Sequence, residues 1–424
     1  MKQYKKRIVD SVLERKLKGV GAVLIEGPKW CGKTTSAEQL AKSVVYLNDP
    51  KKGSMYMQLA KMSPQSLLKG ETPILLDEWQ LAPSLWDTIR FEVDHRDEEG
   101  QFILTGSAVP IQTDEIHHSG TGRFARIKMR PMSLWESEES EGLVSLRSLF
   151  DGKAEVAQCK EVSIEDIAYL ICRGGWPKAT LQDKDIALDR ATDYYDAIVT
   201  IDISRVDDIS RDTERTKRLM RSYARFQGSQ TSICKIKEDM QSNDAMKIDD
   251  DTVGSYIKAL EKIFVIEDMP AWNPNLRSKT AIRTSNTRYF TDPSIATAAL
   301  GIGPKDLLND LETFGLLFET MCVRDLRVYA DALGGMVYHY RDKNGLECDA
   351  VVHLRNGDYG LIEIKLGGSN LVEDGASSLK TLAGKIDTEK MKSPSFLMVL
   401  TAVGSFAYQR EDGVWVVPVC SLKD

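Results

Sequence analysis

The stretch GPKWCGKTT at residues 27–35 decides the fold of the first part of the chain. It matches the phosphate-binding pattern G-x-x-x-x-G-K-[ST], whose fixed positions are filled by Gly27, Gly32, Lys33 and Thr34. The apolar run GAVLIEG before it is typical of a buried parallel strand, and TTSAEQLAKS after it has helical spacing. Because strand, loop and helix follow in the order that this pattern requires, the sequence predicts a nucleotide-binding loop on an α/β sheet.

ATP with Mg²⁺ is the expected ligand of this loop. The backbone amides of the loop and the N-terminus of the following helix would face the phosphates. Lys33 would neutralise the β and γ oxygens, and the Thr34 hydroxyl would reach the metal ion. Trp30 and Cys31 fill variable positions and receive no separate role. The expected nucleotide-binding set is the whole loop: Gly27, Pro28, Lys29, Trp30, Cys31, Gly32, Lys33, Thr34 and Thr35.

A second apolar run, PILLDEW, ends in two adjacent acids. Asp77 is expected to hold Mg²⁺, and Glu78 to act as the general base that polarises the attacking water. An acidic entry to a solvated loop is the alternative, which the upstream phosphate-binding pattern disfavours. A third apolar run, QFILTGSA, ends in Thr105, Gly106 and Ser107. Either a γ-phosphate sensor or a simple turn is expected there.

Two arginines follow a glycine-rich turn in the segment GTGRFARIKMRP. Arg123 or Arg126 is therefore a candidate arginine finger, a group that is worth about 10³ to 10⁵ in rate where one operates. Arginines in ordinary surface ion pairs are the alternative. The sequence does not decide between these two residues.

The segment RTKRLMRSYARF begins a region with helical spacing and concentrated positive charge. Spacings of three, four and seven residues place Arg218, Arg221 and Arg225 on one helical face, with apolar residues around the other. Two further helical periods and the strand-like FVIEDMPAW complete the order helix, turn, helix and β-ribbon, which is typical of a winged helix. The basic face is a candidate contact for DNA phosphates. A solvated face and a winged helix that packs on protein are the alternatives.

The segment VYHYRDKNGLECDAVVHLRNGDYGLIEIKL predicts a strand meander with turns at its two Asn-Gly dipeptides. Period-two alternation puts Glu347 and Asp349 on one face of a strand, and Glu363 and Lys365 on one face of the next. Two acids and a lysine on paired strands are what a Mg²⁺-dependent phosphodiesterase needs. Asp349 and Glu363 would hold the metal, and Lys365 would orient or activate water. Charged residues on a solvated sheet face are the alternative.

Taken in order, these motifs resemble prokaryotic AAA-type ATPases that carry a C-terminal nuclease-like domain of uncharacterised function. The resemblance includes RGGWPKAT at residues 173–180, TDPSIA near residue 291 and the closing DGVWVVPVCSL. It implies a P-loop parallel-sheet core, a helical lid, a winged helix and a restriction-endonuclease-like α/β domain of the PD-(D/E)-x-K type. Glu319, at the matching helix position, would be a further metal ligand. The expected boundaries are 1–135 for the ATPase core, 136–205 for the lid, 206–285 for the winged helix and 286–424 for the nuclease-like domain.

Composition limits the partners that the chain is expected to have. Its 56 basic and 63 acidic residues give a net charge of −7, so contact with nucleic acid requires a local basic surface. No apolar stretch is long enough to span a membrane, and the 7 cysteines include no C-x-x-C pair, which indicates reduced thiols. We therefore expect a cytoplasmic protein without a membrane anchor. DNA, a protein partner and oligomer formation remain open.

Two functions fit these patterns. The first is an ATPase whose hydrolysis cycle drives or gates the nuclease-like domain, with DNA as a candidate target. The second is a nucleotide-loaded switch or scaffold in signalling or defence, with slow turnover and an inactive nuclease-like domain. Stimulation of ATP hydrolysis by DNA separates the first function from the second.

Overall fold

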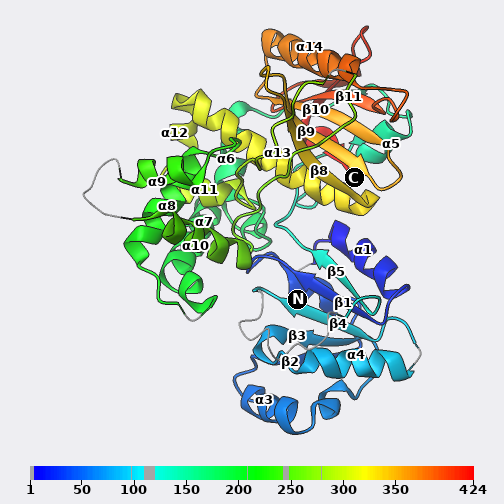
Figure 1. The fold of residues 1–424 in the computed structure, drawn as a ribbon, viewed down its shortest axis with the longest axis vertical. Helices are drawn as coiled ribbons and strands as arrows, with labels where there is room; N and C mark the ends of the chain where they lie inside the picture. The colour runs from blue at the N-terminus through cyan, green and yellow to red at the C-terminus, as the bar shows by residue number, and fades with distance from the viewer. Residues whose placement is uncertain (1–3, 97, 109–119, 208, 242–247, 278) are drawn as a thin grey trace. The chain divides into compact units, whose positions relative to one another are not determined.

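The computed structural model describes residues 4–96, 98–108, 120–207, 209–241, 248–277 and 279–424 (Figure 1). The chain divides into two compact units, each of which contains segments that are distant in sequence. Unit 1 consists of residues 1–131, 200–211 and 258–265, and unit 2 of residues 132–199, 212–257 and 266–424. The division into four consecutive domains stays a prediction.

Unit 1 is built on a parallel sheet with the strand order β2-β3-β4-β1-β5. Its strands are β1 (Ala22–Glu26), β2 (Ser43–Tyr46), β3 (Ile74–Asp77), β4 (Phe102–Gly106) and β5 (Phe124–Lys128). The three central strands are buried along almost their whole length, as expected for a parallel sheet that is covered on both faces. This parallel core in a mixed α/β chain confirms the predicted fold class.

Helices cover both faces of this sheet. They are α1 (Ile8–Leu17), α2 (Lys33–Glu38), α3 (Gly53–Met62) and α4 (Leu85–Arg96). Successive side chains of a strand point to opposite faces. Val23 of β1 accordingly packs in one apolar cluster with Leu13 of α1, whereas the adjacent Leu24 packs in another with Trp86 of α4.

The middle of the chain is helical. Its helices are α6 (Ile164–Arg173), α7 (Lys184–Thr200), α8 (Thr213–Arg225), α9 (Ile233–Gln241), α10 (Asp250–Lys262), α11 (Pro293–Leu300) and α12 (Pro304–Asn309). After α10, antiparallel bridges join Ile266 to Phe290 and Met269 to Thr287. Helices followed by a paired ribbon are the element order expected of a winged helix, and that assignment stays a prediction. Within the described ranges, no helix is both long and apolar enough to cross a membrane.

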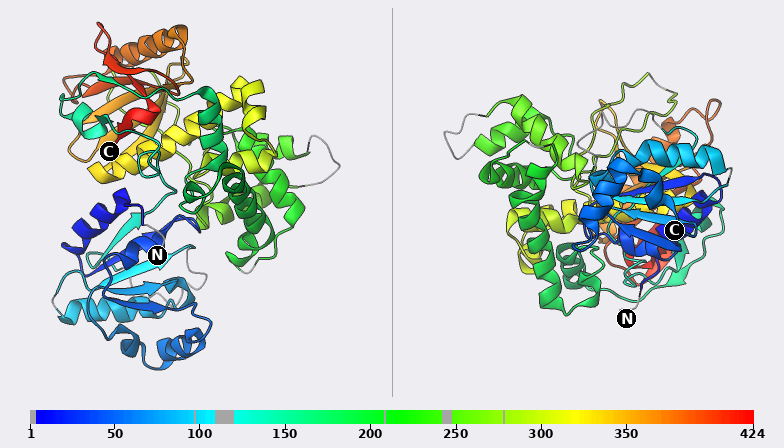
Figure 2. Two further views of the ribbon diagram at one scale, coloured as in Figure 1. Left: turned by 180° about the vertical axis from the view of Figure 1, so that it is seen from behind. Right: turned by 90° about the horizontal axis from the view of Figure 1, so that it is seen from below.

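The C-terminal part of unit 2 contains a mixed sheet with the strand order β7-β12-β13-β11-β10-β9-β8. The long helix α13 runs against this sheet in both Figure 1 and Figure 2. A second helix, α14, packs on the strands through apolar side chains such as Leu379. The helices and strands from residue 311 to residue 418 are α13 (Leu311–Leu333), β8 (Gly335–Arg341), β9 (Glu347–Leu354), β10 (Tyr359–Lys365), α14 (Ser369–Lys385), β11 (Phe396–Thr401), β12 (Phe406–Gln409) and β13 (Trp415–Pro418).

Two short strands from earlier in the chain pair with C-terminal strands. β7 (Ala157–Gln158) pairs with β12, and β6 (Val144–Ser145) pairs with β14 (Leu422–Lys423). The short helix α5 (Leu146–Phe150) follows β6 directly. The region that was expected to form a helical lid, residues 136–205, therefore includes strands that are paired with the C-terminal strands.

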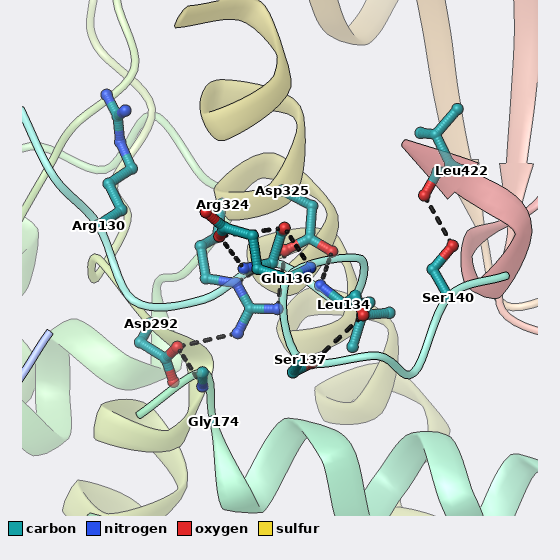
Figure 3. A network of polar contacts seen from close by, with 12 residues as sticks. Arg130, Leu134, Glu136, Ser137, Ser140, Gly174, Asp292, Arg324, Asp325 and Leu422 are labelled. Atoms are coloured by element: carbon teal, nitrogen blue, oxygen red, sulfur yellow. Dashed lines mark hydrogen bonds and ion pairs between the residues drawn. The ribbon is translucent and has the colours of Figure 1, made fainter. Parts of the chain in front are cut away.

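A buried ionic network joins the RGGWP segment to α11 and α13 (Figure 3). Arg324 of α13 lies 2.9 Å from the Oδ2 atom of Asp292 and 2.7 Å from the Oδ1 atom of Asp325. Asp292 also accepts a hydrogen bond from the amide of Gly175, and Asp325 accepts one from the amide of Leu134. The three charged side chains are at most 2% exposed, so the loss of Arg324 would leave two buried carboxylates without the cation that they share.

Candidate functional site

The loop between β1 and α2 has the tight backbone that a phosphate cradle needs. A Cβ atom on Gly27 would lie 2.0 Å from the carbonyl oxygen of Met129, so only glycine fits at this position. Gly32 precedes α2 with a φ of 101°, in the left-handed region that favours glycine. The two glycines of the pattern are thus fixed by close approach and by backbone conformation.

Lys33 lies inside this loop. Its Nζ atom donates to the carbonyl oxygens of Gly27 and Pro28, at 2.9 and 2.8 Å, and its side chain is buried. The ammonium group is therefore held where the pattern places the phosphates, and phosphate oxygens would replace the two carbonyls as its partners.

The N-terminal segment supports the loop from outside, a feature that sequence reasoning missed. Arg7 is buried and donates to the carbonyl oxygen of Cys31 at 2.7 Å and to that of Arg130 at 2.9 Å. The Tyr4 hydroxyl lies 2.9 Å from the Ser36 hydroxyl of α2. Arg7 belongs to the cluster of basic residues near the N-terminus, but the spacing of that cluster does not predict a hydrogen bond to a carbonyl group of the loop.

Asp77 ends β3 directly opposite Thr105 of β4. The Thr34 hydroxyl donates to the Oδ1 atom of Asp77 at 2.7 Å, and the Thr105 hydroxyl donates to the same atom at 2.6 Å. A threonine hydroxyl beside a carboxylate at the edge of the phosphate loop fits Mg²⁺, which prefers oxygen ligands. The structure thus brings together Thr34 and Asp77, the two residues that were predicted to hold the ion.

Glu78 stands in the left-handed region with a φ of 57°. Its Oε2 atom accepts hydrogen bonds from the Ser107 hydroxyl, at 3.2 Å, and from the Gln80 side-chain amide. Ser107 was expected to sense phosphate or form a turn, and here it contacts the expected general base. Gln80 was missed, because a glutamine two residues after the acid belongs to no pattern. Both partners fix the direction in which the carboxylate points.

The two candidate arginine fingers are both engaged in ion pairs. Arg123 donates to Asp94, and Arg126 lies 3.0 Å from Glu26 and 5.7 Å from the centre of the Trp86 ring. These pairs are partly exposed, which is the arrangement that the sequence analysis gave as the alternative. A catalytic role for either arginine stays a prediction.

A second polar cluster lies in the C-terminal sheet and contains the four residues predicted there. Lys365 Nζ of β10 lies 2.6 Å from Glu363 Oε2 and 3.3 Å from Asp349 Oδ2 of β9. Asp349 also accepts a hydrogen bond from the Ile364 amide at 2.8 Å. Glu319 of α13 accepts a hydrogen bond from the Tyr289 hydroxyl, a partner that sequence reasoning missed.

The electrostatics of this cluster reflect burial and crowded negative charge. Burial and the Asp349 carboxylate raise the pKa of Glu363 to about 8, against the opposing effect of Lys365. Burial and the same carboxylate raise the pKa of Glu319 well above its ordinary value. Burial disfavours the charged form of Lys365, but the Asp349 and Glu363 carboxylates outweigh it and raise the pKa of the lysine. The cluster contains more carboxylates than cationic groups to neutralise them.

The same cluster is not arranged as a ligand set. Among the residues that the structure describes, no three His, Cys, Asp or Glu side chains are disposed to hold a metal ion together. Asp349 and Glu363 instead converge on the ammonium group of Lys365. The three acids supply oxygen atoms of the kind that Mg²⁺ binds, but Lys365 occupies the position between two of them. The metal site in this domain stays a prediction.

Three family models match separate parts of the chain. Residues 20–138 match a family described as an AAA domain, residues 164–306 match a domain of unknown function (DUF8612), and residues 314–422 match a domain of unknown function (DUF4143). The first match contains the phosphate-binding loop, Asp77 and Glu78, and it supports an AAA-type ATPase for this part of the chain. The descriptions of the other two families give no activity.

Distant relatives extend over much of the chain. An uncharacterized protein of Mycobacterium tuberculosis is 22% identical over 356 residues, which are 83% of this chain and 72% of that protein. An uncharacterized protein of Haemophilus influenzae is 22% identical over 210 residues, or 50% of this chain and 48% of that protein. These similarities connect the chain to proteins whose names describe no function.

Two solved structures resemble the chain at low scores. A Walker-type ATPase of Pyrococcus abyssi has a TM-score of 0.43 at 13% identity and covers 70% of this chain and 96% of its own. The ORC2 protein of Aeropyrum pernix, solved as ADPNP and ADP complexes, has a TM-score of 0.32 at 14% identity and covers 62% of this chain and 86% of its own.

Proposed function

We propose that the chain binds ATP and hydrolyses it to ADP and phosphate. The observation that carries this proposal is the grouping of Lys33, Thr34, Asp77 and Glu78 at one edge of the parallel sheet. The carboxyl ends of parallel strands are where open α/β sheets bind their ligands. The match of residues 20–138 to the AAA domain family supports the same activity.

Residues of the loop and residues at the end of β3 have different roles in the proposed hydrolysis. Lys33 binds the β and γ oxygens, and the amides at the start of α2 bind the remaining phosphate oxygens. Glu78 accepts a proton from water as the water oxygen attacks the γ phosphorus, and the bond to the β–γ bridging oxygen breaks. Mg²⁺, when it is held by Thr34 and Asp77, supplies charge neutralisation on the phosphates.

The test is steady-state release of phosphate from ATP by the purified full chain. We expect turnover by the wild type and none by Lys33→Ala. The same measurement with single-stranded and double-stranded DNA asks whether nucleic acid is a target, and we expect DNA to accelerate turnover. An equal rate for the wild type and Lys33→Ala would contradict the proposal.

We propose further that nucleotide state is coupled to the C-terminal domain. The support is chain continuity: residues 200–211 belong to unit 1 and continue directly from α7, most of which belongs to unit 2. In this proposal the C-terminal domain is a nuclease-like module acting on DNA, with Lys365 as a catalytic residue. Mg²⁺-dependent DNA cleavage that is lost in Lys365→Ala is the expected result.

A nucleotide-loaded switch is the second candidate. It is favoured by the ion pairs of Lys365 with Asp349 and Glu363, because the ammonium group occupies the position between these two carboxylates that a metal ion would otherwise take. A switch should hold its nucleotide, turn over slowly and change its oligomeric state or partner. Light scattering in the presence of ATP and then of ADP measures that change, and DNA-stimulated turnover would exclude this candidate.

A further inference from the structure

The transition state of ATP hydrolysis carries negative charge on the γ-phosphoryl oxygens, and an arginine commonly stabilises it. Both candidates from the sequence are held by other partners, Arg123 by Asp94 and Arg126 by Glu26. Another arginine of unit 1, Arg205, lies where the predicted helical lid meets the predicted winged helix. Its segment, residues 200–211, contains the 3₁₀ helix η5 (Asp202–Arg205).

An ion pair attaches this segment to the phosphate-binding loop. The Nζ atom of Lys29, in the loop, donates to the Oδ1 atom of Asp202 at 2.6 Å. Asp202 is 9% exposed, whereas the side chain of Lys29 is 43% exposed. One face of η5 is therefore in direct contact with the loop that receives the triphosphate.

The segment is fixed by its own contacts. Arg211 is buried and binds both oxygens of Asp207, at 2.7 and 2.9 Å, and it donates to the Ile203 carbonyl oxygen at 3.0 Å. Ile203 and Val206 are buried apolar anchors. A bidentate arginine–carboxylate pair has a defined geometry, so these contacts fix the shape of the segment that contains η5.

Helix geometry then determines the side of η5 on which Arg205 lies. A 3₁₀ helix has three residues per turn, so side chains three positions apart are eclipsed. Arg205 is three residues after Asp202 and is consequently on the face that contacts the loop. Its side chain is exposed, and it makes no ion pair with another described residue.

The positive charge of Arg205 also favours an anionic ligand. Lys29 and Asp202 neutralise each other in their ion pair, and Arg205 adds one positive charge beside them. A long cationic side chain at the edge of a phosphate-binding loop attracts an anionic ligand, and guanidinium binds phosphate oxygens in a bidentate manner.

We propose that Arg205 binds the γ-phosphate of ATP in the same chain and stabilises the charge that develops on it during hydrolysis. This inference rests on the proposed ATPase function. ADP lacks the γ-phosphate, so Arg205 makes the site distinguish ATP from ADP. Because η5 follows α7 in the chain after one residue, the contact also reports the nucleotide state to the helical region.

The test compares Arg205→Ala and Arg205→Lys with the wild type. In a Glu78→Gln background, which prevents turnover, Arg205→Ala should bind a fluorescent ATP analogue about tenfold more weakly and the matching ADP analogue with unchanged affinity. In the background with Glu78 intact, kcat should fall by about 10³ or more, the lower end of the range of arginine-finger effects. Arg205→Lys should recover part of both losses.

A matched control and a mixing experiment complete the test. Arg355 is an exposed arginine in the turn after β9, and Arg355→Ala should leave binding and turnover at wild-type values. A mixture of Lys33→Ala and Arg205→Ala should stay inactive if the arginine acts within its own chain, whereas recovered activity would overturn this assignment.

The outcomes separate this inference from the proposed function. If the wild type neither binds nor hydrolyses ATP, the proposed function fails and the inference fails with it. If the wild type hydrolyses ATP and Arg205→Ala does so equally well, only the inference fails. Equal losses of ATP and ADP affinity would also overturn it, because the arginine would then act on a phosphate that the two nucleotides share.

Discussion

Lys33 and Glu78 serve different steps of the proposed reaction, so their substitutions should separate binding from turnover. Lys33→Ala removes the buried ammonium group of the loop, and we expect it to abolish ATP binding. Glu78→Gln keeps the shape of the side chain but cannot accept a proton, so this variant should bind ATP without hydrolysing it. Equilibrium binding and phosphate release measure the two effects. Normal turnover by both variants would refute the assignment of the site.

Gln80 and Ser107 should act through Glu78. Both donate to its Oε2 atom, so their removal leaves the carboxylate present but less well oriented. We expect Gln80→Ala and Ser107→Ala each to lower kcat about tenfold, a part of the 10² to 10⁴ that a general base supplies, with little change in KM. Gln409→Ala, at an exposed position in β12, is the control. A change in KM alone would indicate a role in binding.

At the scale of elements, the sequence predicted those that have a strong periodic or motif signal. β1, α2, β3 and β4 were all expected from apolar runs and the glycine pattern, and β9 and β10 from alternation. β6 and β7 were not expected, because a two-residue strand has no periodicity to read and is defined only by a partner far away in the sequence. The same limit applies to η5, whose position depends on Lys29 and Arg211.

The turn after α6 should tolerate no side chain at its second glycine. A Cβ atom on Gly175 would lie 2.1 Å from the carbonyl oxygen of Met132. This oxygen belongs to the main chain, so it can move away only if the backbone shifts. We expect Gly175→Ala to lower the free energy of unfolding by about 2 kcal/mol or more. Gly384→Ala, in α14 with open space around it, should be neutral or stabilising by about 0.5–1 kcal/mol. Chemical denaturation of both variants checks the contrast.

The basic face of α8 is the predicted contact surface for DNA phosphates. Arg221 is exposed, and Arg225 lies 2.8 Å from Asp239, which a phosphate would have to replace. If Arg218, Arg221 and Arg225 each contact one phosphate, the slope of log affinity against log salt should be about −2.7, from about −0.9 per contact. Replacing all three by alanine should flatten this slope, as measured by fluorescence anisotropy at several salt concentrations. An unchanged slope would place the contact elsewhere.

At the scale of the whole molecule, the sequence does not show which distant segments of the chain belong to the same folded unit. Unit 1 is completed by residues 200–211 and 258–265, which begin within the C-terminal ends of α7 and α10. Arg211 is buried in the first of these segments and Lys262, in the second, lies 3.8 Å from Asp207. Charge and spacing in the sequence mark neither segment as part of a nucleotide-binding unit, because the partners that give them this role are separated by many residues.

The last prediction concerns the acidic cluster of the C-terminal sheet and its effect on the thermal stability of the protein. Glu319, Asp349 and Glu363 lie near one lysine, and burial together with the Asp349 carboxylate raises the pKa of Glu319 and of Glu363. A divalent cation that the carboxylates bind would relieve the repulsion between them and stabilise the folded state by mass action. At ten times its dissociation constant the gain is about 1.4 kcal/mol, which corresponds to a rise in Tm of about 3–6 °C for a cooperative unit of about 150–250 residues.

Thermal melts of the full chain without nucleotide, in Mg²⁺, Mn²⁺ or chelator, measure this effect. The rise should disappear in Asp349→Asn, whose amide keeps the shape of the side chain but not its charge. Glu347→Gln is the matched control, because Glu347 lies two residues earlier on β9 and pairs with Arg341 at the surface. It should retain the full rise. If no metal shifts the melt, the ion pairs of Lys365 and the raised pKa values of Glu319 and Glu363 stabilise the cluster without a metal ion. The C-terminal domain then has the predicted residues without a metal-dependent chemistry.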